Sequence, residues 1–202
     1  GHALKQQGHT QEGREHLEQA IGQFQGALRG SPRDADLHFQ LGLAYSQAER
    51  TSEAITELRE AIRLRPKHGE ALFNLGMSLE KQGEVQESEE VFRRATADSE
   101  VAADAYHALG VLMNKQGKVE EAVKLYEQCV ALRPTQSLAV EELSGYYLGN
   151  RRFRDAIRIL RLAASKSPNN VTVLNTLAKL LATCRDPQLR DGPMAVTLAT
   201  RA

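Results

Sequence analysis

Tryptophan is absent from this sequence of 202 residues, which contains only five phenylalanines, five tyrosines and two cysteines. A net charge is also absent, because 26 basic residues balance 26 acidic residues. This neutrality argues against nucleic acid or an anionic membrane as the main partner. No apolar run reaches the length of about 18 residues that a transmembrane helix needs, so we expect a soluble protein without membrane insertion.

The two cysteines, Cys129 and Cys184, have neither the Cys-x-x-Cys spacing of a redox or zinc motif nor the number expected of a disulfide framework. We expect both to remain thiols. Free thiols are compatible with a reducing compartment such as the cytoplasm, but two cysteines are too few to decide the compartment.

What the sequence does contain is an internal repeat of 34 residues. A leucine recurs at this spacing, at Leu41, Leu75, Leu109, Leu143 and Leu177. The residue after each leucine is small: Gly42, Gly76, Gly110, Ser144 and Ala178. Prolines keep the same spacing at Pro32, Pro66, Pro134 and Pro168, with Glu100 in the remaining slot. Two further columns of small residues are Ala20, Ala54, Ser88, Ala122 and Ala156, and Ala27, Ala61, Ala95, Cys129 and Ala163.

Within each repeat the apolar residues fall into two blocks with helical spacing, for example residues 35–48 and 52–65. Each repeat therefore predicts a hairpin of two helices. Where two helices cross at a short distance, a small residue on one makes room for a large residue of the other, which explains the small columns. Gly83 and Gly117 are expected to end first helices in the left-handed conformation, and the prolines are expected to end second helices.

This arrangement resembles the tetratricopeptide repeat family, which has the same 34-residue period. The stretches AYHALGVLMNKQGKVEEAVKLYEQCVALRP and ALFNLGMSLEKQGEVQESEEVFRRA follow the family pattern closely. The resemblance implies an all-α fold, a right-handed α-solenoid of helix-turn-helix repeats. Departures are local, because Glu49 and Arg151 replace the glycine between helices and Glu100 replaces a proline. We expect altered turns at these points, with the fold retained.

The resemblance predicts a single array over residues 1–202. Residues 1–32 form a partial repeat with a lengthened second helix, residues 35–68, 69–102, 103–136 and 137–170 form full repeats, and residues 171–202 form an atypical terminal repeat. Gly8 is expected between two helices, and the second helix is expected from Thr10 to Arg29. Near the other end we expect a short helix from Pro193 with an exposed apolar face. Both ends are typical of a fragment of a longer, bacterial-type array.

No residues suited to catalysis or metal binding come together in the sequence. His2, His9 and His16 are seven residues apart, which on a helix separates neighbours by about 10 Å, too far to share a metal ion. No phosphate-binding glycine loop, supported nucleophile or carboxylate pair can be identified. We therefore expect no enzymatic activity, no cofactor and no metal site.

The first helix of each repeat is expected to contribute to a partner-binding groove, because first helices line the concave side of solenoids of this type. The groove would combine an apolar band with polar flanks. Its predicted residues are Phe39, Leu43, Phe73, Asn74, Met77, Lys81, His107, Val111 and Lys115. An extended peptide or an amphipathic helix would suit such a groove. The alternative is that the apolar band, including its two phenylalanines, fills contacts between neighbouring helices.

Two specialised grooves of the resembled family do not match this sequence. Members that grip the C-terminal carboxylate of chaperones use a clamp of Lys, Arg and Asn, of which only Asn74 fits here. The asparagine ladder of protein O-linked N-acetylglucosamine transferases is mostly missing. We favour a non-catalytic scaffold that binds a protein or a peptide. A substrate-presenting arm of a larger enzyme, such as a glycosyltransferase, and a homo-oligomerisation module that associates through uncapped ends are the alternatives.

A second candidate surface is basic, because residues 151–166 contain six basic residues and one acidic residue. Its predicted members are Arg151, Arg152, Arg154, Arg158 and Arg161. Such a patch would suit an acidic partner, a phosphorylated segment or the acidic part of another copy. The alternative is an ordinary solvated helix face.

Overall fold

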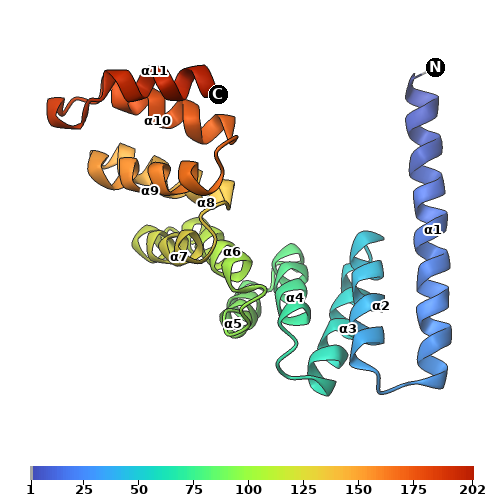
Figure 1. Ribbon diagram of the computed structural model, residues 1–202. Coiled ribbons are helices and arrows are strands. Elements are labelled where there is room, and N and C mark those ends of the chain that lie inside the picture. The colour runs from blue at the N-terminus through green and yellow to red at the C-terminus, as the bar shows by residue number, and fades with distance from the viewer. Residues whose placement is uncertain (1) are drawn as a thin grey trace. The chain divides into compact units, whose positions relative to one another are not determined.

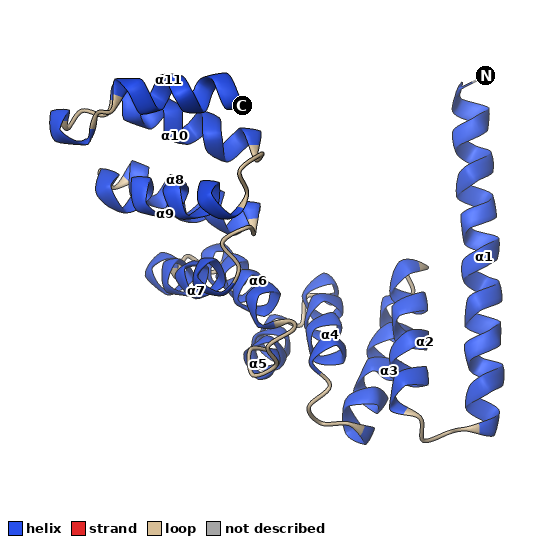
Figure 2. Cartoon of the chain, in the orientation of Figure 1, coloured by secondary structure: helices blue, strands red, loops and turns tan. Residues whose placement is uncertain are grey.

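The computed structural model describes the backbone of residues 2–202 and the side chains of residues 13–202. Within this range the chain is 79% helical and contains no strand, which confirms the predicted fold class (Figures 1 and 2). None of the described helices combines the length and the apolar character that crossing a membrane requires.

The helices follow one another as hairpins after a long first helix, α1 (His2–Gly30). The five hairpins are α2 (Ala35–Gln47) with α3 (Thr51–Leu64), α4 (Gly69–Gln82) with α5 (Val85–Ala95), α6 (Ala102–Lys115) with α7 (Val119–Leu132), α8 (Ser137–Gly149) with α9 (Phe153–Lys166), and α10 (Val171–Thr183) with α11 (Gly192–Arg201). A short 3₁₀ helix, η1 (Pro187–Leu189), lies between the last two. The helical blocks predicted at residues 35–48 and 52–65 therefore match α2 and α3 to within one residue.

The chain divides into two compact units, Gly1–Ala105 and Tyr106–Ala202, which we call the N-terminal and C-terminal units. The boundary lies inside α6 and therefore does not coincide with a predicted repeat boundary. In the N-terminal unit, α1 packs on α2 through Ile21, Phe24 and Leu28. In the C-terminal unit, α8 packs on α9, α9 on α10 and α10 on α11.

Close helix crossings at the small residues confirm the explanation of the small columns. A methyl group added at Gly42 would lie 2.8 Å from the side chain of Leu58. The corresponding distances are 2.6 Å from Gly76 to Phe92 and 2.5 Å from Gly110 to the Tyr126 ring. A Cβ atom does not fit at such distances without a shift of its neighbour. The exposed Ala27 is an exception to its column, because it lies on the side of α1 that α2 does not cover.

The turns that follow the first helices share one geometry whether or not glycine is present. Gly83 and Gly117 have φ angles of 89° and 76°, as predicted, and Glu49 and Arg151 have φ angles of 61° and 58°. The altered turns expected at these two residues are therefore wrong. Each turn closes with the same backbone hydrogen bond, for example from the Arg50 N–H to the Tyr45 carbonyl at 2.9 Å. This bond and the packing of the hairpins override the local preference of a side chain for negative φ.

The connection after α5 does differ, as expected from the missing proline. Helices α3, α7 and α9 each end two residues before a proline. Helix α5 already ends at Ala95, and the turn residues 96–101 lead to α6. Within this turn the Asp98 carboxylate accepts a hydrogen bond from the Glu100 N–H at 2.9 Å.

The helices predicted at the two ends are present, but the predicted break near the N-terminus is not. Helix α1 is unusually long, as predicted, but it runs without a break from His2 to Gly30. Gly8 therefore does not separate two helices, and a single glycine costs a helix only about 1 kcal/mol relative to alanine. The short helix predicted from Pro193 is α11, which begins at Gly192 and exposes Met194 and Val196.

Candidate partner-binding surface

Phe39, the first predicted groove residue, lies in the core of the N-terminal unit. Its side chain is only 5% exposed, and its ring centroid lies 4.7 Å from that of His68, at the start of α4. The predicted contribution of Phe39 to a groove is therefore wrong, because the following hairpin covers the ring.

Leu43, Phe73 and Met77 form an apolar strip on neighbouring first helices, which we call the α2–α4 strip. Helices α2 and α4 are in contact, and Leu43 and Phe73 are half-buried against the same core cluster. The Phe73 ring rests on Phe92, with 5.8 Å between the centroids. Met77 is 45% exposed, an unusual exposure for a large apolar side chain. In this strip Leu43 and Phe73 are held against the core, whereas Met77 is accessible to a ligand.

The polar residues near this strip differ in how strongly they are held. Asn74 donates a hydrogen bond from Nδ2 to the Glu70 carbonyl at 2.9 Å, so its side chain is tied to its own helix. Lys81 is exposed in the last turn of α4. In the first turn of α2, Asp36 accepts two hydrogen bonds from Arg65, at 2.7 and 2.8 Å. This guanidinium holds the pKa of the Asp36 carboxyl below its usual value.

In the C-terminal unit the predicted groove residues are His107, Val111 and Lys115 of α6. His107 and Val111 are half-buried and Lys115 is exposed. The His107 ring lies 5.9 Å from the Tyr126 ring. This pair occupies the repeat positions of Phe73 and Phe92, so the same ring contact occurs in both units.

Tyr126 is buried, including its hydroxyl group, and that hydroxyl has no hydrogen-bond partner among the residues that the structure describes. Burial, with a smaller effect of the Glu142 carboxylate, raises the pKa of Tyr126 to about 12. Tyr147 differs, since its hydroxyl donates a short hydrogen bond to the Glu127 carboxylate. Burial is the main cause that raises the pKa of Tyr147 to about 12 as well.

The five arginines of the predicted basic patch are all exposed, but they have different roles. Arg152 donates to Asp155 at 2.8 Å and lies 4.5 Å over the Tyr147 ring, so it stabilises the α8–α9 hairpin. Arg151 occupies the left-handed turn position. Arg154, Arg158 and Arg161 follow one another along one face of α9.

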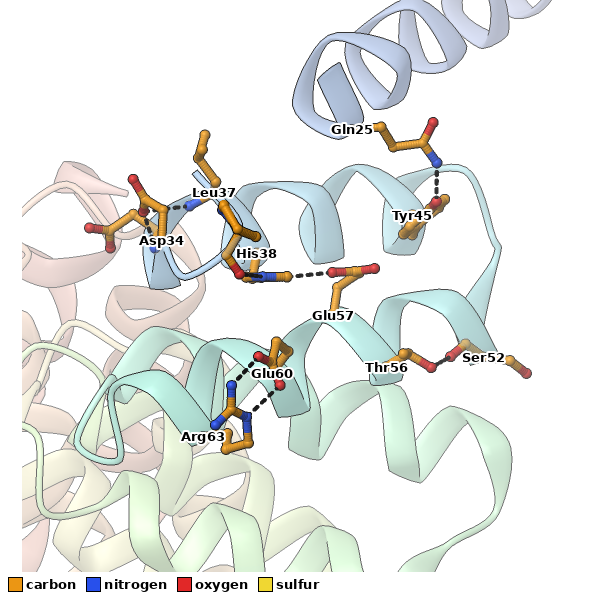
Figure 3. Close-up of polar contacts among 12 residues, drawn as sticks. Gln25, Asp34, Leu37, His38, Tyr45, Ser52, Thr56, Glu57, Glu60 and Arg63 are labelled. Atoms are coloured by element: carbon orange, nitrogen blue, oxygen red, sulfur yellow. Dashed lines mark hydrogen bonds and ion pairs between the residues drawn. The ribbon is translucent and has the colours of Figure 1, made fainter. Parts of the chain in front are cut away.

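Sequence reasoning missed several polar contacts between helices. The His38 ring on α2 lies 2.6 Å from the Glu57 carboxylate on α3, and Gln25 on α1 donates to the Tyr45 hydroxyl at 2.8 Å (Figure 3). The sequence does not reveal the His38–Glu57 contact, because the two residues are 19 positions apart and are not related by the repeat. These contacts hold neighbouring helices together. Among the described residues, no group of three or more His, Cys, Asp or Glu side chains is placed to hold a metal ion.

Comparison with known proteins supports the same fold. The family model of the tetratricopeptide repeat matches residues 1–68, 39–102 and 81–137. A crystal structure of MamA has 23% sequence identity and a TM-score of 0.67, over 81% of this chain and 95% of that one. PilF of Pseudomonas aeruginosa has 22% identity and a TM-score of 0.69, over 97% of this chain and 87% of that one.

YrrB, described as a tetratricopeptide repeat protein with an unusual peptide-binding site, has 14% identity and a TM-score of 0.59, over 88% of this chain and 89% of that one. At these identities the likeness concerns the fold. No curated protein sequence matches the chain closely enough to identify a relative. The family model, however, extends over well more than half of the sequence. This chain belongs to the tetratricopeptide repeat family.

Proposed function

We propose that the protein is an interaction scaffold whose N-terminal unit binds a peptide or an amphipathic helix of a partner protein on the α2–α4 strip. The observation that carries this proposal is the exposure of Met77 beside the half-buried Leu43 and Phe73. Grooves that bind helices or peptides usually have a floor of buried apolar side chains and a few accessible apolar side chains that contact the ligand. Methionine also adapts its shape to different ligands.

The polar surroundings are compatible with a peptide ligand. Lys81 offers a cation for a carboxylate at one end of the strip, while Asn74 and Asp36 are already engaged by Glu70 and Arg65. The expected ligand is therefore mainly apolar, with an acidic group toward the end of α4. That YrrB is described as having a peptide-binding site agrees with this class of ligand.

Because the natural ligand is not identified, binding to the α2–α4 strip is tested with a selected peptide. Peptides would be selected from a displayed random library on the 202-residue chain, and their affinities would be measured for Met77→Glu and for the control Gln86→Glu. Both changes add one negative charge at an exposed residue of the α4–α5 hairpin, but Gln86 lies on α5, outside the strip. We expect Met77→Glu to weaken binding by about tenfold or more, as for the loss of an apolar anchor, and Gln86→Glu to leave it nearly unchanged.

Equal affinities of both variants would show that the strip is not the binding surface. Helical circular dichroism of each variant serves as the control for folding. Phe73→Ala is less suitable as a first test, because Phe73 packs on Phe92 and its loss would also affect stability.

A further inference from the structure

The exposed face of α9 carries a row of arginines. Arg154, Arg158 and Arg161 are all exposed, and their spacing of four and three residues places them on one face of the helix. The buried residues of α9 lie on its other side, where the helix packs on α8 and α10. We call these three residues the α9 arginine row.

This face of a second helix stays open within the array. The residues that occupy the repeat position of Arg158 are Thr56 in α3, Glu90 in α5 and Lys124 in α7, and all three are exposed. Each of these helices is followed by a further hairpin, which leaves the position uncovered. The exposure of the α9 arginine row is therefore a property of the repeat.

Arg161 lacks the acidic partner that its counterpart in α5 has. Arg93 occupies the same repeat position and donates to Glu89, four residues earlier, at 2.9 Å. The counterpart in α3 forms an ion pair as well. The residue four positions before Arg161 is the buried Ile157, which cannot accept a hydrogen bond from a side chain. Among the residues that the structure describes, no carboxylate forms an ion pair with Arg161.

The other two members of the row are weakly engaged. Arg154 approaches the neutral side-chain amide of Gln188, at 3.5 Å. Arg158 lies 3.9 Å from Asp155, whose carboxylate already accepts a hydrogen bond from Arg152 at 2.8 Å. The positive charge of the α9 arginine row is thus largely uncompensated.

The surrounding sequence offers the row no further carboxylate. Residues 151–202 contain ten basic and three acidic residues. Asp186 and Asp191 cap η1 and α11, each through a hydrogen bond from a backbone N–H group at 3.0 Å. The third acidic residue is Asp155, which Arg152 holds. All three acidic residues are therefore engaged within the chain.

We infer that the α9 arginine row binds an acidic helix of a partner protein that lies along α9. A guanidinium group pairs with a carboxylate through two parallel hydrogen bonds, which a lysine cannot form. Carboxylates at positions i, i+4 and i+7 of a helix lie on one face with the same spacing as the row. The site lies in the C-terminal unit, and its ligand is opposite in character to the mainly apolar ligand proposed for the α2–α4 strip.

A short protein segment fits the charges of this chain better than a long polyanion does. Three arginines over about two helical turns match a ligand with only a few carboxylates. Residues 1–105 contain twelve basic and eighteen acidic residues, and the whole chain has no net charge. Nucleic acid or an anionic membrane would require a more extended basic surface.

Two helical peptides test the inference on the 202-residue chain. Both have the same composition and the same covalent staple, but the first has glutamates at i, i+4 and i+7 on one face, and the second has them spread around the helix. Fluorescence anisotropy at low ionic strength measures both affinities. We expect the first peptide to bind at least about fivefold more tightly, and its affinity to fall as salt screens the charges. Absence of binding, or equal binding of the two peptides, would overturn the inference.

Matched variants locate the site. Arg158→Glu is expected to weaken binding of the first peptide by about tenfold or more, because it opposes like charges. The control Lys124→Glu makes the same change of charge at the same repeat position of α7, and we expect an effect of about twofold at most. Arg158→Lys keeps the charge without the planar guanidinium, and we expect a loss of about threefold. Equal effects of Arg158→Glu and Lys124→Glu, in variants with unchanged circular dichroism, would contradict the assignment to α9.

Two further measurements separate this site from other binding modes. Met77→Glu alters the α2–α4 strip and is expected to leave binding of the acidic peptide unchanged, whereas a loss of binding would place the peptide on that strip and overturn the inference. A single-stranded oligonucleotide and vesicles that contain phosphatidylserine are tested in the same way. If either binds more tightly than the peptide and Arg158→Glu abolishes that binding, the row recognises phosphate groups and the assignment to an acidic helix is wrong.

Discussion

Glu49 and Arg151 hold the backbone conformation that glycine holds at Gly83 and Gly117. A side chain in this left-handed region costs about 1–2 kcal/mol, because its Cβ approaches the following carbonyl group. The α2–α3 and α8–α9 hairpins therefore fold despite a local backbone penalty that glycine removes in the α4–α5 and α6–α7 hairpins. Because the penalty depends on a single residue, a substitution should remove it from one turn or introduce it into another.

Glu49→Gly is expected to raise the free energy of unfolding by about 1 kcal/mol, and Gly83→Glu is expected to lower it by a similar amount. Urea denaturation followed by circular dichroism measures both. Glu49→Ala is the control, since alanine removes the carboxylate and keeps the strained backbone. A gain with alanine as large as with glycine would show that the carboxylate, and not the backbone, is responsible.

Tyr126 provides a second prediction, because its buried hydroxyl is unpaired and its pKa is raised to about 12. The unfolded chain deprotonates its tyrosines near pH 10. The stability that depends on neutral Tyr126 is therefore complete below about pH 10 and is lost as the pH rises toward 12. Tyr126→Phe is expected to be at least as stable as the parent at pH 8, and to lose less stability between pH 10 and 12.

Tyr147→Phe is the comparison for this prediction, because the Tyr147 hydroxyl is paired with Glu127. Its removal is expected to destabilise the protein at neutral pH, by about 1 kcal/mol or more. Denaturation at a series of pH values and absorbance near the tyrosinate band would follow both variants. A loss of stability in Tyr126→Phe equal to that in Tyr147→Phe would contradict the unpaired state of the Tyr126 hydroxyl.

The α5–α6 connection shows how an element adapts when one repeat position changes. Helix α5 contains 11 residues where α3, α7 and α9 contain 14. The slot of the repeated proline therefore falls inside the turn after α5 instead of just beyond a helix end. There the Glu100 N–H donates to Asp98, a role that proline cannot take.

Restoring the repeated proline with Glu100→Pro is accordingly expected to destabilise the protein, although it makes the repeat more regular. The loss relative to Glu100→Ala, which keeps the N–H, is expected to be about 1 kcal/mol. Thermal unfolding of the two variants measures it. A proline variant that is more stable than the alanine variant would show that the Asp98 contact does not hold the turn.

The helices and their close crossings could largely be predicted from the sequence, because the period of 34 residues places large and small residues at the same positions in each hairpin. Gly76 and Gly110 could be assigned to close crossings without knowing their partners, and both crossings are observed. The contacts from His38 to Glu57 and from Tyr147 to Glu127 could not, because they join positions that are not repeated.

Phe39 and Phe73 show why the sequence alone could not predict which residues of the candidate surface are exposed. They occupy the same repeat position, yet one is buried and the other is half-exposed. His68 in the next hairpin covers the Phe39 ring, and the corresponding position after Phe73 is Ala102, which is too small to make that contact. The exposure of a groove residue thus depends on a neighbour one repeat away.

At the scale of the whole molecule, the most extensive contacts join helices that follow one another in sequence. In arrays of this kind a local defect is expected to spread mainly to neighbouring repeats. Gly76→Leu forces a side chain into the space of Phe92 and should lower the hydrogen-exchange protection of α4 and α5. The protection of α9 and α10 should change little, as mass spectrometry of exchanged peptides would show. A uniform loss over both units would indicate that the chain unfolds as one cooperative body.

Both cysteines are buried and neither is part of a disulfide; Cys129 lies in α7 and Cys184 just after α10. A thiol reagent can reach them only when the surrounding helices separate, so the rate of labelling measures how often that separation occurs. The two thiols thus report separately on the middle of the C-terminal unit and on its last hairpin. Faster labelling of Cys184 than of Cys129 would show that the last hairpin opens more often than the region around α7, without any added probe.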